Sequence, residues 1–257
     1  MNNNPISFSS RNVRNSAGAK RLALICTVAI CLLGSALPEV ATSGNAPRAA
    51  AVAARTARTI ATGPWDDDRE RLSGSTRAEL TAQFWRWNYS IPLGVDPNSD
   101  TSGANCGINQ VGDVWFLAGP LGTFTSSCTI PAGKLIVSAV NASIDDYPCP
   151  DPAFKPASGQ SLEEFLLQDI GPLIDGIVGV AAQLDGRSLT VRRIKSQLFS
   201  FTAAASRLPF DSCITGSPQL GVSDGYFVFI EPLPRGDHVL QLRSGGTNLG
   251  TVHLTIR

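Results

Sequence analysis

Apolar residues recur at helical spacing behind a capping box at residues 76–79. In this motif the Thr and Glu side chains each satisfy the other residue's backbone N–H, which marks the start of a helix. Leu80, Phe84 and Trp87 follow on one helical face. The pattern predicts a helix over residues 77–88.

A second capping box, at residues 161–164, precedes another apolar helical face over residues 165–177. Pro172 lies within this stretch. Because proline lacks a backbone N–H and clashes with the preceding turn, we expect it to break or restart the helix.

The rest of the chain is rich in short runs of β-branched and aromatic residues between glycines and prolines, which indicate strands. The clearest signal is Asp185-Gly186 between residues 180–184 and 188–194, since Asp-Gly supplies the positive φ of a tight hairpin turn. The other predicted strands are 111–118, 135–140, 197–202, 225–231, 238–243 and 249–256.

Closely spaced strands with glycine and proline turns are typical of an all-β architecture. The predicted fold is mainly β: a single antiparallel β-sandwich of jelly-roll or Ig-like type, with one or two peripheral α-helices. We place this domain at residues 65–257.

The N-terminus has the pattern of an export signal. Basic residues precede an apolar run at residues 22–37, and small residues follow it. We therefore predict a signal peptide over residues 1–41 and a flexible, Ala-rich leader over 42–64. The protein is expected to be secreted, periplasmic or in the cell envelope. An uncleaved anchor is the alternative; with cleavage, no stable membrane span is expected.

Composition narrows the class of protein. Hydrophobic residues make up 43% of the chain and charged residues 16%, which excludes disorder of the whole chain. Basic and acidic residues number 21 each, so the basic footprint of a nucleic-acid-binding protein is missing. No phosphate-binding or dinucleotide-binding glycine loop occurs in a strand-to-helix context, and no nucleotide cofactor is predicted.

Beyond the predicted signal peptide, four cysteines indicate two disulfides in an exported chain. Three pairings are open. We favour Cys106–Cys128, which closes a local loop, and then Cys149–Cys213. A thiol-ligated metal or redox site is the alternative, but no Cys-x-x-Cys is present.

Several short motifs resemble an uncharacterised group of predicted secreted bacterial proteins. They are Trp-x-Trp at 85–87, Asp-x-Ser-Gly-x-x-Cys at 100–106, Val-Trp-Phe-Leu-Ala-Gly at 114–119 and Cys-x-Ile-Pro-Ala-Gly-Lys at 128–134. The resemblance covers roughly residues 80–256. It implies secretion and a single β-rich domain, and it supplies no catalytic residues. Thr123 stands where the pattern has a second glycine, so that turn is expected to differ.

Trp85, Trp87 and Trp115 are candidate binding residues, because exposed tryptophans in a secreted β-sandwich can stack on sugar rings. The alternative is that they pack in the core. Trp85 and Trp87 lie about 200° apart on a helix, so we expect one of them to be available to a partner.

Asp96, Asn98 and Asp100 space oxygen ligands two residues apart, as calcium loops do. The following glycine comes two positions late for an EF-hand. The loop is therefore either a Ca²⁺ site or an Asx-turn loop without metal.

Asp145 and Asp146 are the most acidic point in the middle of the domain. Together with Glu231 or Asp224 they are candidates for the paired carboxylates of glycoside hydrolysis. The alternative is solvated loop carboxylates. Ser-His-Asp catalysis is not indicated, because both histidines fall in predicted strands and no Gly-x-Ser-x-Gly is present.

The leading functional hypothesis is a secreted binding or structural module, with a glycan or another cell-envelope component as its partner and no catalytic constellation. The alternative is a secreted glycan hydrolase that uses paired carboxylates.

Overall fold

The computed structural model describes residues 71–120 and 122–257, so the predicted signal peptide and leader lie outside the described residues. The described residues form two helices, α1 (Arg77–Ser90) and α2 (Leu162–Asp175), ten strands and a short 3₁₀ helix (Ala205–Arg207). The strands are β1 Val114–Leu117, β2 Phe124–Ile130, β3 Leu135–Tyr147, β4 Ala181–Leu184, β5 Arg187–Leu189, β6 Arg192–Lys195, β7 Phe199–Phe201, β8 Gln219–Ile230, β9 Gly236–Ser244 and β10 Thr247–Ile256.

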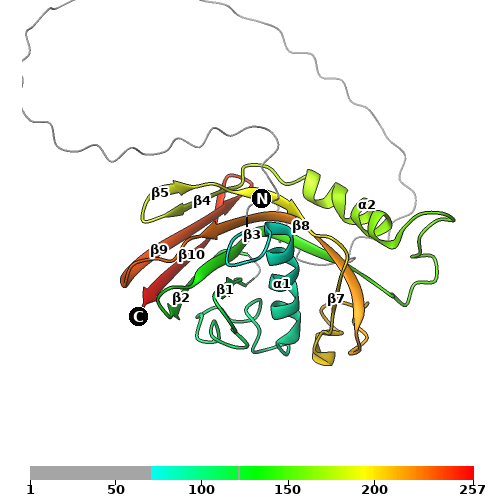
Figure 1. Ribbon diagram of the computed structural model, residues 1–257, viewed down its shortest axis with the longest axis horizontal. Coiled ribbons are helices and arrows are strands. Elements are labelled where there is room, and N and C mark those ends of the chain that lie inside the picture. The colour runs from blue at the N-terminus through cyan, green and yellow to red at the C-terminus, as the bar shows by residue number, and fades with distance from the viewer. Residues whose placement is uncertain (1–70, 121) are drawn as a thin grey trace, which may run out of the picture. The chain divides into compact units, whose positions relative to one another are not determined.

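These strands form two five-stranded sheets (Figure 1). One has the order β1-β3-β8-β6, with β7 also paired to β8, and the other has the order β2-β10-β9-β4-β5. The fold is mainly β as predicted, but the expectation of purely antiparallel sheets is wrong. Strands β1 and β3 pair in parallel, as do β2 and β10. The chain leaves the first sheet after β1, adds β2 to the second and returns as β3, a crossover that local patterns do not reveal.

Both faces of the first sheet are covered. On one face, Ile136 and Val228 share an apolar cluster with Leu240 and Val252 of the second sheet. On the other face α1 packs through residues such as Phe84 and covers the core. Helix α2 packs on the ends of β3 and β8, beside the second sheet (Figure 1).

Both predicted helices begin where expected, because the Thr76–Glu79 and Ser161–Glu164 capping boxes are formed. The expected break at Pro172 is wrong, since α2 continues through it to Asp175. A proline this close to the end of a helix removes one backbone hydrogen bond and leaves the preceding turns intact.

The hairpin at Asp185-Gly186 is confirmed, with φ of 50° and 76°. The strand predicted after it is divided between the sheets, because β5 pairs with β4 whereas β6 pairs with β8. Strand β2 was not predicted, since Ser and Thr fill much of its sequence. Strand β3 extends seven residues beyond the predicted 135–140.

Both predicted disulfides are present, Cys106–Cys128 and Cys149–Cys213. Paired cysteines point to an oxidising, extracytoplasmic compartment. Within the described residues, no helix has the length and apolar content needed to cross a membrane.

Candidate functional site

The three candidate tryptophans lie in the core. Trp85, Trp87 and Trp115 are 2%, 6% and 8% exposed. The indole N–H of Trp85 donates to Ser223 Oγ at 2.7 Å, and that of Trp87 donates to the Ile108 carbonyl at 2.9 Å. The expectation that Trp85 or Trp87 is available to a partner is therefore wrong, and none of the three presents an exposed ring for sugar stacking.

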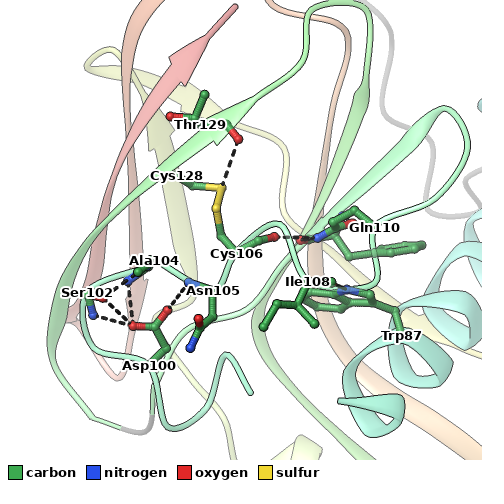
Figure 2. Close-up of a disulfide and its surroundings, with 12 residues drawn as sticks. Trp87, Asp100, Ser102, Ala104, Asn105, Cys106, Ile108, Gln110, Cys128 and Thr129 are labelled. Carbon is green, nitrogen blue, oxygen red and sulfur yellow. Dashed lines mark hydrogen bonds between the residues drawn. A yellow bond between two sulfur atoms is a disulfide. The ribbon is translucent and has the colours of Figure 1, made fainter. Parts of the chain in front are cut away.

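Both helix tryptophans are buried because α1 is covered on two sides. Trp85 faces β8, and the loop that follows the helix lies over Trp87 (Figure 2). Trp87 also packs on Phe116 of β1, with ring centroids 5.8 Å apart. The prediction assumed that only one face of the helix is buried. Here the loop after α1 buries a second face, on which Trp87 lies.

This loop is joined to β2 by the Cys106–Cys128 disulfide, and its turn is built around Asp100 (Figure 2). Partial burial raises the pKa of Asp100, but hydrogen bonds from the Ser102 side chain and from the turn's backbone outweigh it and lower the pKa from its ordinary value. The backbone N–H donors, at 2.7–3.0 Å, belong to Ser102, Gly103 and Asn105. This carboxylate thus organises the turn.

Asp96 has a similar structural role. Its carboxylate accepts hydrogen bonds from the backbone N–H groups of Gly94 and Asn98, and lies 3.3 Å from the guanidinium of Arg207. The Asp96 and Asp100 carboxylates each accept hydrogen bonds within their own turn and are not directed at a shared cation. The arrangement is that of Asx-turn loops, and the Ca²⁺ alternative is not supported.

The carboxylates considered for hydrolysis do not form an accessible pair. Asp145 and Asp146 are 3% and 0% exposed and are adjacent on β3, so they face opposite sides of the sheet. Ile136 of β3 pairs with Ile230, which precedes Glu231. Asp145 lies nine residues further along β3, so roughly 30 Å separates it from Glu231.

Asp224 is also engaged. It is fully buried and accepts a two-pronged interaction from Arg193, at 2.9 Å from Nε and 2.7 Å from Nη2. Arg193 also contacts Asp175 at the end of α2, 2.6 Å away. These hydrogen bonds, first among them those that Arg193 donates to Asp224, raise the pKa of Arg193. The cluster fastens α2 to the sheet.

One group of potential metal ligands occurs among the described residues: Asp146, Asp211 and Cys213, all buried. Cys213 is in a disulfide, so its sulfur is not a thiolate ligand. Asp211 accepts a hydrogen bond from Tyr89, and Asp146 accepts one from Gln219. Burial, and then the charge of Asp211, raise the pKa of Tyr89 well above its ordinary value. With the neutral Tyr89 phenol and the Gln219 amide as partners, the two carboxylates form a buried polar network.

A groove of about 360 Å³ runs along α1. On the helix side, Glu79, Gln83 and Arg86 recur at helical spacing and face the groove. Ala78 and Ala82 leave room between these longer side chains. The groove therefore follows from a small-residue stripe on a helix whose other sides are buried.

The opposite wall comes from residues 197–199, which lead into β7 and include its first residue, and Arg71 also lines the groove. The Nη1 atom of Arg71 lies 4.0 Å from Glu79 Oε2. That carboxylate also accepts the backbone N–H of Thr76, and this hydrogen bond is the main reason why the pKa of Glu79 is lowered. The groove is thus a polar surface that contains two arginines, one carboxylate and two amides.

None of the groove's polar residues was a candidate in the sequence. Glu79, Gln83 and Arg86 occupy the positions between the apolar residues of a predicted helix, where a solvated face is the normal interpretation. Gln197 and Phe199 reach the groove only because β6 and β7 both pair with β8. The signal available in the sequence was the Ala78/Ala82 stripe within this polar face.

Comparison of the chain with protein-family models, curated proteins and solved structures found no match.

Proposed function

We propose that this protein is a secreted binding module that holds a hydroxyl-rich glycan in the groove along α1. The observation that carries the proposal is the groove itself, since it is lined by guanidinium, carboxylate and amide groups on a disulfide-stapled β scaffold. In this proposal the two packed sheets act as a sandwich that supports the groove.

The polarity of the groove favours a sugar over an apolar ligand. Typical small-molecule pockets are mostly apolar with a few polar groups. Here Gln83 and Gln197 each offer a donor and an acceptor, which suits the hydroxyl groups of a sugar. Gln83 donates its amide N–H to Ser75 Oγ at 3.1 Å, so its orientation is held before a ligand binds.

The proposal is tested by co-sedimentation of the exported full-length chain with insoluble polysaccharides and cell-wall preparations, with protein assayed in the pellet and soluble sugar in the supernatant. We expect binding without sugar release. Gln197→Ala should weaken binding about fivefold, because it removes one hydrogen bond of about 1 kcal/mol.

Gln241→Ala is the matched control, since Gln241 lies on β9, away from the groove lining. It should leave binding unchanged. Equal affinity of Gln197→Ala and the unsubstituted protein would place the ligand elsewhere. Sugar release would instead identify a hydrolase.

A further inference from the structure

Arg86 is held in one orientation at the edge of the groove. Its Nε donates to the Ser200 carbonyl at 2.8 Å, and its guanidinium lies 5.3 Å from the centroid of the Phe199 ring. Both contacts leave the two terminal Nη groups without a hydrogen-bond acceptor among the described residues. The guanidinium is therefore held in place while its Nη groups stay available to donate hydrogen bonds to a ligand.

The charges that line the groove are distributed unevenly. Arg71 and Glu79 face each other, and the helix N-terminus and Thr76 further neutralise the Glu79 carboxylate. Arg86 lies seven residues along α1 from Glu79, roughly 10 Å away. No carboxylate of the described residues lies within salt-bridge distance of Arg86. Among the residues that the structure describes, Arg86 is thus the groove's uncompensated positive charge.

We infer that the ligand is an acidic glycan whose carboxylate is bound by Arg86, an inference that rests on the proposed function. Guanidinium groups bind carboxylates through two parallel N–H···O bonds, and an arginine already fixed by stacking and by Nε loses little freedom in doing so. Gln83 and Gln197 then lie on either side of the groove to contact the hydroxyl groups of the same sugar. A uronic-acid polymer combines these two chemistries.

The test compares one polymer with and without its charge. Binding of the full-length chain to polygalacturonate and to its methyl-esterified form is measured by titration calorimetry at 0.15 M salt. We expect the acid form to bind roughly 10- to 100-fold more tightly than the ester, the range for one hydrogen-bonded ion pair.

Arg86→Gln should lower the affinity for the acid form to that for the ester and leave the ester's affinity unchanged. Arg86→Lys keeps the charge without the two-pronged geometry and should give an intermediate affinity. Arg243→Gln, on the exposed part of β9, is the control for non-specific attraction and should change neither. Unchanged melting temperatures show that the variants are folded.

The outcomes separate the two proposals. Equal affinity for acid and ester in the unsubstituted protein, both weakened by Gln197→Ala, would overturn the carboxylate inference and keep the glycan groove. Arg86-dependent binding of dextran sulfate without binding of polygalacturonate would also overturn it. Absence of binding to every polysaccharide would overturn both.

Discussion

Arg207 is a charged residue with no exposed surface, and its guanidinium binds backbone carbonyls at the end of α1. Its Nε and Nη2 donate to the carbonyls of Ile91 and Asn88 at 2.9 and 2.7 Å, and Asp96 supplies the countercharge. The pKa of Arg207 is lowered, mainly because the side chain is buried, and the negative charge of Asp96 opposes this shift. The residue thus joins the end of α1 and the turn that contains Asp96 to the 3₁₀ helix.

His238 and Asp185 form the clearest pH-sensitive contact. The Nδ1 of His238 lies 2.7 Å from Asp185 Oδ2, and its Nε2 lies 3.0 Å from the Pro234 carbonyl. The hydrogen bond to Asp185, and then that to Pro234, raise the pKa of His238 above 6.5. The hydrogen bond from His238 in turn lowers the pKa of Asp185.

We predict that His238→Gln is less stable than the unsubstituted protein at low pH, and that this difference in the free energy of unfolding shrinks as the pH rises. A histidine whose pKa is higher in the folded state stabilises the folded protein. The full contribution is present when the pH is below the unfolded-state pKa of about 6.5, and it is lost as the pH rises through the folded-state pKa. Urea unfolding between pH 5.5 and 9 measures it. Because the Asp185 side chain is 46% exposed, we expect a change below about 1 kcal/mol.

His253→Gln is the control, since His253 is exposed on β10. A pH trend of the same size in His253→Gln would show that the effect does not come from the contact between His238 and Asp185. A stability difference for His238→Gln that stays constant over this range would contradict the assignment.

At the scale of elements, the outer edge of β1 is closed by a side chain. The Oε1 of Gln110 accepts the Phe116 N–H at 3.0 Å, and its Nε2 donates to the Phe116 carbonyl at 2.7 Å and the Cys106 carbonyl at 3.0 Å. An amide side chain thereby replaces a neighbouring strand. Unpaired edges invite pairing with another chain, so this contact also covers the β1 edge against such pairing.

We predict that Gln110→Ala lowers the free energy of unfolding by about 2 kcal/mol, because the N–H and carbonyl of Phe116 lose their partners. We also expect concentration-dependent association through the exposed β1 edge. Urea unfolding and light scattering measure the two effects. Gln241→Ala should show neither, and a Gln110→Ala protein as stable as that control would disprove the role.

At the scale of the whole molecule, the disulfides tie loops to different layers. Cys106–Cys128 joins the loop after α1 to the second sheet, whereas Cys149–Cys213 joins the chain after β3 to the segment before β8. They span 22 and 64 residues. Loop-closure entropy in the unfolded chain grows with this separation.

Replacing both cysteines of each pair by alanine should therefore destabilise the protein by about 3 kcal/mol for Cys106–Cys128 and about 4 kcal/mol for Cys149–Cys213. Parallel urea titrations of the two double variants measure the difference. A larger loss for the shorter loop would show that packing around the disulfide, and not chain entropy, dominates.

Local patterns determined much of this fold. The capping boxes, the helical faces behind them and the Asp185-Gly186 hairpin depend on neighbours within a few residues, so the chain specifies them directly. Strand β2 and the end of β3 escaped prediction for the opposite reason. Asn141, Ser143 and Asp145 look like loop residues, and only pairing with β8 makes them strand.

The site was decided by tertiary structure. The sequence by itself determined a mainly β chain, two helices and the cysteines that pair, because periodicity and residue chemistry are local. It did not determine that a loop buries Trp87, that Asp145 and Glu231 lie far apart, or that residues 197–199 face α1 across a groove. These features depend on which strands become neighbours, and sheet order is set by contacts between residues far apart in the chain.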